Sequence, residues 1–336
     1  MDPPPVSIGV AAYNAESTIR PLLDSLLELE YPDYEVVIVD DGSVDRTADI
    51  VREYTGSDSS IRLVEQANQG ASAARNRAFE AASNEIIAYT DSDTRVDGVW
   101  LRELVRPFSD PDVGATTGRT VFGTNNTCTS WVRSVDIAVR NSRRGETTRL
   151  ANGPNCAFRR ELLAEIGGFD PEWFHAEDTA VSYDVYAHGY EIRYVPEAEV
   201  YHVPEDDWRE YLSKRYRDAK AFTRVLFTHP KDAAVEDDFV PATWKLQPPL
   251  FAVLVFGLPL MLLLGPLGLV TAAGVFAIGV ALNVPFALRV AWRARRPRFF
   301  WATLALTTAR GFFWGLGLVV GAVTNGFRYG PRSVID

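Results

Sequence analysis

The chain has 336 residues, with 44 acidic side chains against 34 lysines and arginines, and its formal net charge is −10. The charge is uneven, because the segment from Gln247 onward holds eight arginines and one aspartate. The first 246 residues therefore keep 26 basic and 43 acidic side chains, a net charge of −17. A surface this acidic repels phosphate backbones, which argues against nucleic acid as the main partner.

The cysteines and the N-terminus both indicate a cytoplasmic setting. Cys128 and Cys156 are too few for a disulfide framework or a zinc site, so we interpret them as buried structural thiols. The opening Met-Asp-Pro-Pro-Pro has no basic region and no long apolar run, unlike a secretory signal. We therefore expect the N-terminal part of the chain to stay in the cytoplasm.

The first ninety or so residues alternate between short apolar strands and amphipathic helices. Strands are predicted at residues 6–12, 34–39, 61–65 and 85–90, and helices at 17–29, from Ser43 or Asp45 to Tyr54, and at 71–82. This alternation predicts an α/β fold with a mainly parallel, Rossmann-like central sheet and helices on both faces. Such sheets bind ligands beyond the carboxyl ends of their strands.

Polar residues follow three of these strands, namely Tyr13-Asn14, Asp40-Asp41 and Asp91-Ser92-Asp93. Their position at the strand ends indicates a nucleotide-type site and leaves the reaction open. Farther along, a helix is predicted at residues 180–188 and short strands at 192–195 and 200–201. Residues 208–226 form a predicted amphipathic, basic helix with Trp208, Tyr211, Leu212, Ala219, Phe222 and Leu226 on its apolar side. We expect this helix to lie at a membrane surface, with a solvated surface helix as the alternative.

The C-terminal part is predicted to lie in a membrane. Leu250 to Leu288 is a run of 39 residues without a charge, whereas one helical span needs about 20 apolar residues. We predict spans at about residues 247–265, 267–289 and 299–323, with a hairpin at the Gly-Pro-Leu-Gly sequence that begins at Gly265. Five arginines lie between residues 289 and 298, and the positive-inside rule makes that loop cytoplasmic.

Arg310 interrupts the third apolar run. An arginine in the middle of a membrane costs several kcal/mol unless it is paired or reaches a polar site. It could contact the phosphate of a lipid substrate, or it could be a snorkelling or interhelical arginine. The sequence leaves both interpretations open.

A series of short motifs runs through about residues 5–205. In chain order they are Val6 to Glu16, Val36 to Ser43 with Asp45 to Thr47, Asn68 to Gly70 with Ala74 to Asn76, Asp91 to Asp93, Asn152 to Asn155 with Ala157 to Arg159, Gly167 to Asp170, Glu177-Asp178, and Gly189-Tyr190 through Tyr201-His202. In this order and spacing the motifs resemble those of the family 2 glycosyltransferases. The resemblance implies a GT-A fold, a nucleotide-sugar donor, a divalent metal (Mn²⁺ or Mg²⁺) and inversion at the anomeric carbon.

By this resemblance, Asp93 contacts the metal. Asp91 lies near the ribose or contacts the groups that coordinate the metal. His202 is a third contact, to the metal or to the diphosphate. A hard divalent cation suits this chemistry, because the leaving nucleoside diphosphate develops negative charge. The alternatives are a turn in which the aspartates cap backbone amides, and a structural histidine.

The resemblance also places donor-binding residues. Asp40 or Asp41 accepts hydrogen bonds from the base or ribose, and Tyr13 stacks near the base. Glu16 and Arg75 fit the donor-binding pattern less closely, and each could instead be a helix-start or surface residue.

Asp178 is the candidate catalytic base, because inverting transfer to a hydroxyl needs a carboxylate that takes the acceptor's proton. Its alternative role is that of a helix N-cap. Glu177 is expected to position the base or to bind the acceptor. Asn152 and Asn155 are expected to line the acceptor side.

Processive polysaccharide synthases of this superfamily carry Gln-x-x-Arg-Trp after the catalytic domain, where this chain has Lys214-Arg-Tyr-Arg217. We therefore predict transfer of one sugar to a lipid-linked (polyprenyl or dolichyl) glycan. The alternatives are transfer to a polyprenyl or dolichyl phosphate, and a non-catalytic scaffold that binds nucleotide-sugar.

The predicted organisation has four parts. They are a GT-A domain at 1–206, an interfacial helix and linker at 207–246, a transmembrane region at 247–325 and a tail at 326–336. The protein is expected to be a multi-pass membrane protein with a cytoplasmic catalytic domain. The sequence leaves its oligomeric state open.

Overall fold

The computed structural model describes residues 3–56, 58, 60–173, 175–230 and 240–329. Parts of the predicted linker (231–239) and tail (330–336) lie outside the described residues. The chain forms two compact units, Met1–Val121 with Arg144–Val203, and Phe122–Arg143 with Pro204–Asp336. The second unit thus begins close to the predicted boundary at residue 206, but it also includes residues 122–143.

Residues 122–143 belong to the second unit, whereas the predicted organisation places them in the GT-A domain at 1–206. Helix α5 (Cys128–Asn141) supplies Val132, Val135 and Val139 to an apolar cluster that otherwise consists of residues from the C-terminal part of the chain. A helix packs where its apolar face finds a partner, and here the partners are more than 70 residues away in sequence. Sequence position alone therefore gave the wrong unit for this helix.

The first unit contains one eight-stranded mixed sheet in the order β3-β2-β1-β4-β7-β6-β8-β5. The strands are β1 (Val6–Ala12), β2 (Tyr34–Asp40), β3 (Ile61–Glu65), β4 (Ile86–Asp91), β5 (Thr94–Val96), β6 (Val113–Phe122), β7 (Asn155–Arg159) and β8 (Glu191–His202). The β1–β2, β2–β3 and β1–β4 pairs are parallel, which confirms the predicted α/β sheet. The β4–β7, β6–β7 and β5–β8 pairs are antiparallel, and the sequence did not predict them.

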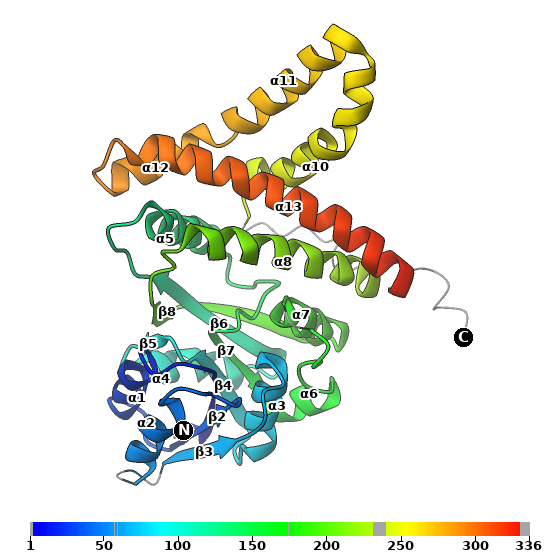
Figure 1. Cartoon of the computed structure of the whole chain (residues 1–336). Helices are drawn as coiled ribbons and strands as arrows, with labels where there is room; N and C mark the ends of the chain where they lie inside the picture. The colour runs from blue at the N-terminus through cyan, green and yellow to red at the C-terminus, as the bar shows by residue number, and fades with distance from the viewer. Residues whose placement is uncertain (1–2, 57, 59, 174, 231–239, 330–336) are drawn as a thin grey trace. The chain divides into compact units, whose positions relative to one another are not determined.

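Helices of the first unit cover both faces of this sheet (Figure 1). They are α1 (Ile19–Leu27), α2 (Thr47–Thr55), α3 (Ala71–Ala81), α4 (Trp100–Val105), α6 (Arg160–Glu165) and α7 (Glu177–Ala187), with a 3-10 turn at Arg106–Ser109. Two details differ from the prediction. The helix expected at 180–188 begins at Glu177, and the two short strands expected at 192–195 and 200–201 are one continuous strand, β8.

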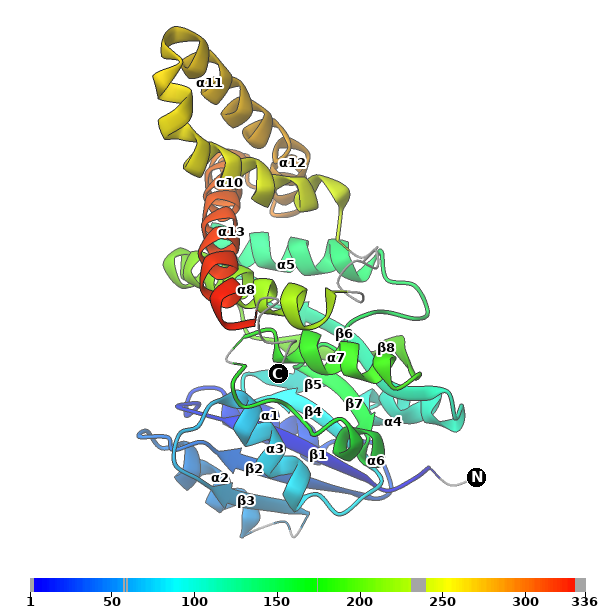
Figure 2. The same ribbon diagram turned by 90° about the vertical axis from the view of Figure 1, so that its right-hand side faces the viewer.

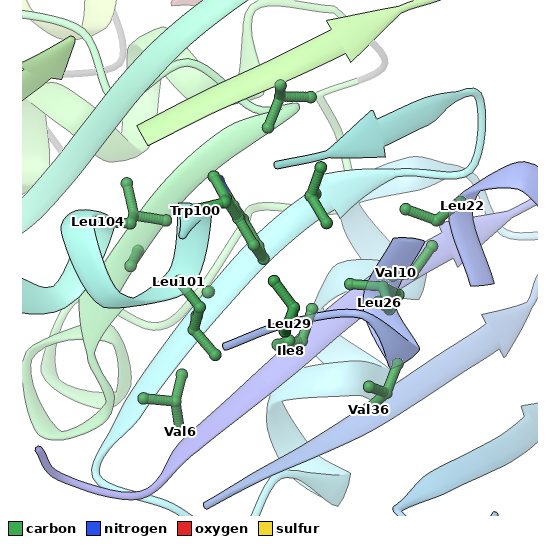
Figure 3. Packing of buried hydrophobic residues seen from close by; sticks show 14 of the residues in the cluster. Val6, Ile8, Val10, Leu22, Leu26, Leu29, Val36, Trp100, Leu101 and Leu104 are labelled. Carbon is green, nitrogen blue, oxygen red and sulfur yellow. The ribbon is translucent and has the colours of Figure 1, made fainter. Parts of the chain in front are cut away.

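Strand alternation divides the core of the first unit into two layers. Alternate residues of β1 and β2, such as Ile8 and Val36, pack with α1, α2 and α4, whereas Val37 and Val39 face α3. Figure 3 shows the first layer, where the fully buried Trp100 of α4 lies near Ile8 and Leu29. The two layers hold the sheet rigid from both faces, so the residues at the carboxyl ends of its strands are firmly placed.

The second unit is helical. It contains α5, α8 (Trp208–Thr228), α10 (Ala242–Leu263), α11 (Gly265–Ala281), α12 (Val284–Arg293) and α13 (Phe299–Tyr329). Three stretches of these helices, Ala242–Leu263, Gly265–Arg293 and Phe299–Arg328, are long and apolar enough to cross a membrane. They match the three predicted spans, and α10 and α11 form the predicted hairpin at Gly265 (Figure 2).

Helix α8 packs along α13 through two glycines of α13. A Cβ at Gly317 would lie 2.5 Å from the Tyr216 carbonyl oxygen, and a Cβ at Gly321 would lie 2.8 Å from the Lys220 carbonyl oxygen. The two backbones can therefore approach closely only because both positions lack a side chain. One side of α8 thus packs on a helix, and the predicted apolar residues Trp208 and Leu226 are exposed.

The close packing of α8 on α13 predicts that a side chain at Gly321 lowers the stability of the protein. Gly321→Val is expected to lower the unfolding free energy by roughly 1–3 kcal/mol, because the new side chain meets backbone that cannot move aside. Thermal unfolding of the detergent-purified protein measures the change as a lower Tm. The control is Gly274→Ala in α11, where a Cβ would meet nothing within 4 Å. A Gly321 variant as stable as this control would show that α8 and α13 do not pack in this way.

Arg310 of α13 is an interhelical arginine. Its Nη1 donates to Asp136 Oδ1 of α5 at 3.3 Å, and its guanidinium lies over the Trp244 ring, 5.3 Å from the ring centroid. Asp136 and Arg310 are both buried. The interhelical alternative for Arg310 is therefore confirmed.

Candidate active site

Two aspartates and a histidine gather where β4 ends and β8 ends. Strand β5 follows the Asp91–Asp93 turn directly and pairs with β8, which sets Thr94 opposite His202. His202 Nε2 lies 3.3 Å from Asp93 Oδ1, and one ligand atom from each of Asp91, Asp93 and His202 lies within 4.8 Å of the others. Carboxylate oxygens and an imidazole nitrogen are suitable ligands for Mn²⁺ and, with more oxygen ligands, Mg²⁺. The three predicted residues thus form a candidate metal site.

The antiparallel half of the sheet is what completes this group. Asp91 and Asp93 follow a parallel strand, but His202 is brought to them by the β5–β8 pair. The site also has a second backbone link, because the Val203 N–H donates to the Asp93 carbonyl at 3.1 Å. The position of His202 beside the aspartates therefore favours the metal-contact interpretation over a purely structural histidine.

Arg75 of α3 is buried and joins two parts of the site. Its Nη2 donates to Asp91 Oδ1 at 3.1 Å, and its Nη1 donates to Glu177 Oε1 at 2.8 Å. Its guanidinium also lies over the Phe169 ring at 5.7 Å. The surface alternative for Arg75 is therefore wrong. Arg75 ties the metal-site turn to the start of α7, where the candidate base lies.

Asp178 lies in the first turn of α7. Its Oδ1 accepts from the Thr179 N–H at 2.8 Å, and its Oδ2 is 3.5 Å from the Gly153 N–H. Burial and, next, the neighbouring charge of Glu177 raise the pKa of Asp178 to about 6, and Arg75 opposes the rise. A carboxyl with a pKa near neutrality is well suited to general-base catalysis, because it is mostly ionised at neutral pH and still accepts a proton readily.

The residue just before this pair is strained. Ala176 has φ +62°, in the left-handed region, and is the N-cap of α7. An alanine there costs about 1–3 kcal/mol and persists only when its surroundings hold it. The N-cap role is thus filled by Ala176 and not by Asp178, whose carboxylate is directed to Gly153 and to its own helix start.

The two aspartates after β2 differ in what they bind. Both oxygens of Asp41 are occupied, with Gln66 Nε2 and the Gln69 and Gly70 N–H groups donating at 2.7 to 2.9 Å. Asp40 accepts from the Ser43 N–H at 3.2 Å, but its buried Oδ1 has no hydrogen-bond partner among the described residues. A buried acceptor without a partner is costly, which indicates that a ligand donor completes it. Asp40 is therefore the better candidate for a base or ribose contact, and Asp41 holds the loop before α3.

Tyr13 and Glu16 follow β1. Tyr13 is half exposed, which leaves its ring available to stack on a base. The Glu16 Oε2 accepts from the Arg46 N–H at 3.1 Å, next to the first residue of α2. Glu16 thus fits its helix-start alternative, and its donor-binding role stays a prediction.

The predicted acceptor-side asparagines also differ. Asn155 is fully buried, and both polar atoms of its amide are hydrogen-bonded. Its Oδ1 accepts from Trp100 Nε1 at 2.9 Å, and its Nδ2 donates to two backbone carbonyls. Asn155 is therefore not available to an acceptor, because both polar atoms of its side chain are already hydrogen-bonded inside the first unit. Asn152 is partly buried, and its Nδ2 donates to Thr120 Oγ1 at 3.1 Å. It remains a candidate for the acceptor side.

The sequence predicts the ionisable residues of the candidate site but not the hydrogen bonds that connect them. It did not anticipate the Arg75 bridge between Asp91 and Glu177, the unpartnered oxygen of Asp40 or the strained Ala176. The Arg75–Glu177 contact joins residues 102 positions apart, and the other two features are properties of single residues in the folded chain. Of these features, only the Arg75 bridge has a sequence signal, which is the Ala-Arg-Asn motif that contains Arg75.

With this geometry in place, comparison with known proteins identifies the family. The model of "Glycosyl transferase family 2" matches residues 7–167. Residues 7–167 thus match glycosyltransferase family 2, as the motifs predicted. The candidate metal site, Arg75 and Asp178 all lie in the first unit, which contains most of this matched region.

Individual relatives agree with the family. The probable glycosyltransferase YdaM of Bacillus subtilis is 30% identical over 237 residues, 66% of this chain and 56% of its own length. The poly-beta-1,6-N-acetyl-D-glucosamine synthase of Staphylococcus epidermidis is 28% identical over 200 residues, 57% of this chain and 48% of its own length. The chain thus spans about half the length of these relatives.

A solved structure matches nearly the whole chain. The mannosyltransferase PcManGT from Pyrobaculum calidifontis, solved in complex with GDP-Man and Mn²⁺, is 26% identical. The similarity covers 97% of this chain and 88% of that one, with a TM-score of 0.59. The likeness extends over both units, so the helical C-terminal part is similar as well as the GT-A domain.

Proposed function

We propose that this protein is an inverting, metal-dependent glycosyltransferase. It takes one sugar from a nucleotide-sugar and transfers it to a lipid-linked (polyprenyl or dolichyl) glycan at the cytoplasmic face of a membrane. The observation that carries this proposal is the joining of the Asp91–Asp93–His202 group to the Glu177–Asp178 pair through Arg75. This hydrogen-bonded connection between the candidate metal site and the candidate base supports the proposal.

The chemistry follows from these groups. The acceptor oxygen forms a bond to the anomeric carbon while the bond from that carbon to the diphosphate oxygen breaks, which inverts the configuration. Asp178 accepts the proton of the attacking hydroxyl, and the nucleoside diphosphate leaves with the bonding electron pair. A divalent cation held by Asp91, Asp93 and His202 would supply charge neutralisation for that diphosphate. Arg75 keeps Glu177 and Asp91 in place on either side.

The second unit supports the proposal of a lipid-linked acceptor. Three helices are long and apolar enough to cross a membrane. They favour an acceptor with a lipid tail, because the enzyme and its acceptor would then lie in the same membrane. The absence of the Gln-x-x-Arg-Trp pattern at Lys214 to Arg217 favours a single transfer over a polymer. The arginine-rich stretch at 289–298 supports a cytoplasmic face for the catalytic unit.

Two alternatives are distinguished by experiment. In the first, the acceptor is a polyprenyl or dolichyl monophosphate, whose oxygen is already ionised and needs no base. In the second, the protein binds nucleotide-sugar without catalysis. The presence of Asp91, Asp93 and Asp178 with a raised pKa at Asp178 favours an enzyme over this scaffold.

The direct test is a screen of the purified, detergent-solubilised protein against a panel of nucleotide-sugars with Mn²⁺ or Mg²⁺. Binding and nucleoside-diphosphate release are both measured. We expect metal-dependent binding of one donor, which names the sugar. A folded protein that binds no donor at any salt concentration would contradict the proposal.

The raised pKa of Asp178 predicts a pH profile. Asp178 must be ionised to act as base, so kcat/KM is expected to be level above pH 6 and to fall about tenfold per unit below it. Arg75 lowers the pKa of Asp178, so Arg75→Gln should shift the midpoint to higher pH. The control is Arg77→Gln on the same helix, an exposed residue paired with Glu80. An Arg75 variant with an unshifted midpoint would show that another group controls the profile.

A further inference from the structure

The second unit contains a cluster of basic side chains around a few carboxylates, which we call the arginine cluster. Its cations are Arg133 and Arg140 of α5, Lys214 and Arg215 of α8, and Arg310 of α13, and its carboxylates are Asp136, Glu205 and Asp218. Asp136 is the centre. It accepts from Arg140 Nε at 3.2 Å and Arg310 Nη1 at 3.3 Å, with Arg133 Nη1 at 3.7 Å.

A second carboxylate extends the cluster toward its outer side. Glu205 Oε1 lies 3.1 Å from Lys214 Nζ and 3.5 Å from Arg133 Nε. Arg215 pairs with Asp218 at 3.2 Å, and its buried Nε has no hydrogen-bond partner among the described residues. The side chains of Arg133, Arg215 and Arg310 are 9 to 12% exposed, whereas that of Lys214 is 39% exposed. The cluster is therefore deep on one side and open at Lys214.

The charges of the arginine cluster do not balance. Among the residues that the structure describes, five cations face three carboxylates, a surplus of two positive charges. Burial lowers the pKa of Arg133 and the neighbouring Arg215 lowers it further, while Glu205 and Asp136 oppose this. The pKa of Arg215 is raised, because Asp218 and Glu205 outweigh the effect of burial there. Uncompensated buried charge is costly, so an arrangement of this kind is stable when an anion completes it.

We propose that the arginine cluster binds the phosphate or diphosphate group of the polyprenyl- or dolichyl-linked acceptor. The inference rests on the proposed function, because it names where the lipid-linked acceptor is held. Two negative charges on the phosphate group would neutralise the surplus. Guanidinium groups bind phosphate oxygens in pairs of parallel hydrogen bonds, and the buried Nε of Arg215 offers an unused donor.

The surroundings of the cluster favour an anion that carries a lipid tail. Arg310 lies within a helix apolar enough to cross a membrane, and its guanidinium packs on Trp244 and Phe286 from α10 and α12. A soluble phosphate gains nothing from these apolar neighbours, whereas a polyprenyl chain packs against such helices. An anionic phospholipid shares the phosphate chemistry, so the experiment must separate the two sources.

The experiment measures lipid binding directly. The full-length, lipid-depleted protein in detergent is titrated with a polyprenyl phosphate, with the polyprenyl alcohol of the same length, and with phosphatidylglycerol, by native mass spectrometry. We expect the phosphate to bind at least about tenfold more tightly than the alcohol and the phospholipid. Arg215→Gln and Arg133→Gln should each weaken phosphate binding about tenfold or more.

Two further variants keep the test decisive. Arg217→Gln removes a basic residue of α8 that pairs with Glu210 outside the cluster, and it should bind like the parent protein. Lys214→Gln removes the most exposed cation of the cluster, so it serves if a buried variant fails to fold. It should weaken polyprenyl phosphate binding while leaving the melting temperature without lipid unchanged, which a purely structural ion pair would not do.

Each outcome has a defined meaning. Equal affinity for phosphatidylglycerol would overturn the assignment to the acceptor, and equal affinity for the alcohol would overturn the phosphate site altogether. So would unaltered binding in Arg133→Gln, Arg215→Gln and Lys214→Gln. Donor binding is measured in the same samples. Metal-dependent nucleotide-sugar binding without lipid-phosphate binding removes this inference and leaves the glycosyltransferase proposal in place.

Discussion

Asp178→Asn is expected to lower kcat for a glycan-hydroxyl acceptor by roughly 10²–10⁴-fold, because the amide cannot take the proton of the attacking oxygen. The substitution preserves the size of the side chain and the oxygen that accepts from the Thr179 N–H, so donor binding and folding should change little. Steady-state kinetics with the donor found in the screen measure the effect. KM for the donor should stay within about threefold of the parent value, since the lost interaction acts in the transition state.

The matched control is Asp184→Asn, which makes the same chemical change farther along α7, outside the candidate site. It should retain the parent rate. The acceptor type is tested in the same experiment. If the true acceptor is a polyprenyl monophosphate, Asp178→Asn will lose much less activity, because that oxygen is ionised before it attacks. A fully active Asp178→Asn enzyme with a glycan-hydroxyl acceptor would rule out Asp178 as the base.

Asp93→Ala is expected to abolish metal-dependent binding of the nucleotide-sugar. Asp93 Oδ1 lies beside His202 Nε2 in the candidate metal group, and removing one of few protein ligands leaves too weak a site for a hard divalent cation. Isothermal titration with donor, in Mn²⁺ and then in excess chelator, measures the effect. The parent protein should lose donor affinity in chelator by about a hundredfold or more, whereas the variant should be equally weak in both.

The control for this experiment is Glu80→Ala, which removes an exposed carboxylate of α3 that pairs only with Arg77 in the described structure. His202→Ala separates the two interpretations of the histidine. A metal ligand predicts a weaker Mn²⁺ dependence of donor binding, whereas a structural histidine predicts a lower melting temperature with an unchanged metal requirement. Metal-dependent donor binding that survives Asp93→Ala would place the cation elsewhere.

Much of the first unit could be predicted because its signals are local. The strands β1, β2 and β4 are six or seven residues long and mostly apolar, and polar residues lie at or just after the end of each. Parallel pairing then brings those polar ends to one edge of the sheet, whatever the rest of the chain does. The candidate metal aspartates and the fold class therefore follow from short windows of sequence.

Other assignments failed because they depend on partners far away in the chain. Asn155 matches an acceptor-side motif, yet the Trp100 indole and the Ala198 carbonyl occupy its amide. The α5 helix was placed in the catalytic domain, although its apolar face packs in the second unit. In both cases the local sequence pattern predicts the segment correctly, but it contains no information about the distant residues against which the segment packs.

By itself, the sequence determined the family, the parallel half of the sheet, the ionisable residues of the candidate site and the three apolar spans. The tertiary structure decided how those residues act together. Arg75 meets Glu177 across 102 residues, and Arg310 meets Asp136 across 174. Periodicity and motifs report on chain segments of about ten residues, whereas an ion pair depends on where two distant backbones meet. Only the folded chain therefore revealed the Arg75 bridge and the charge surplus of the arginine cluster.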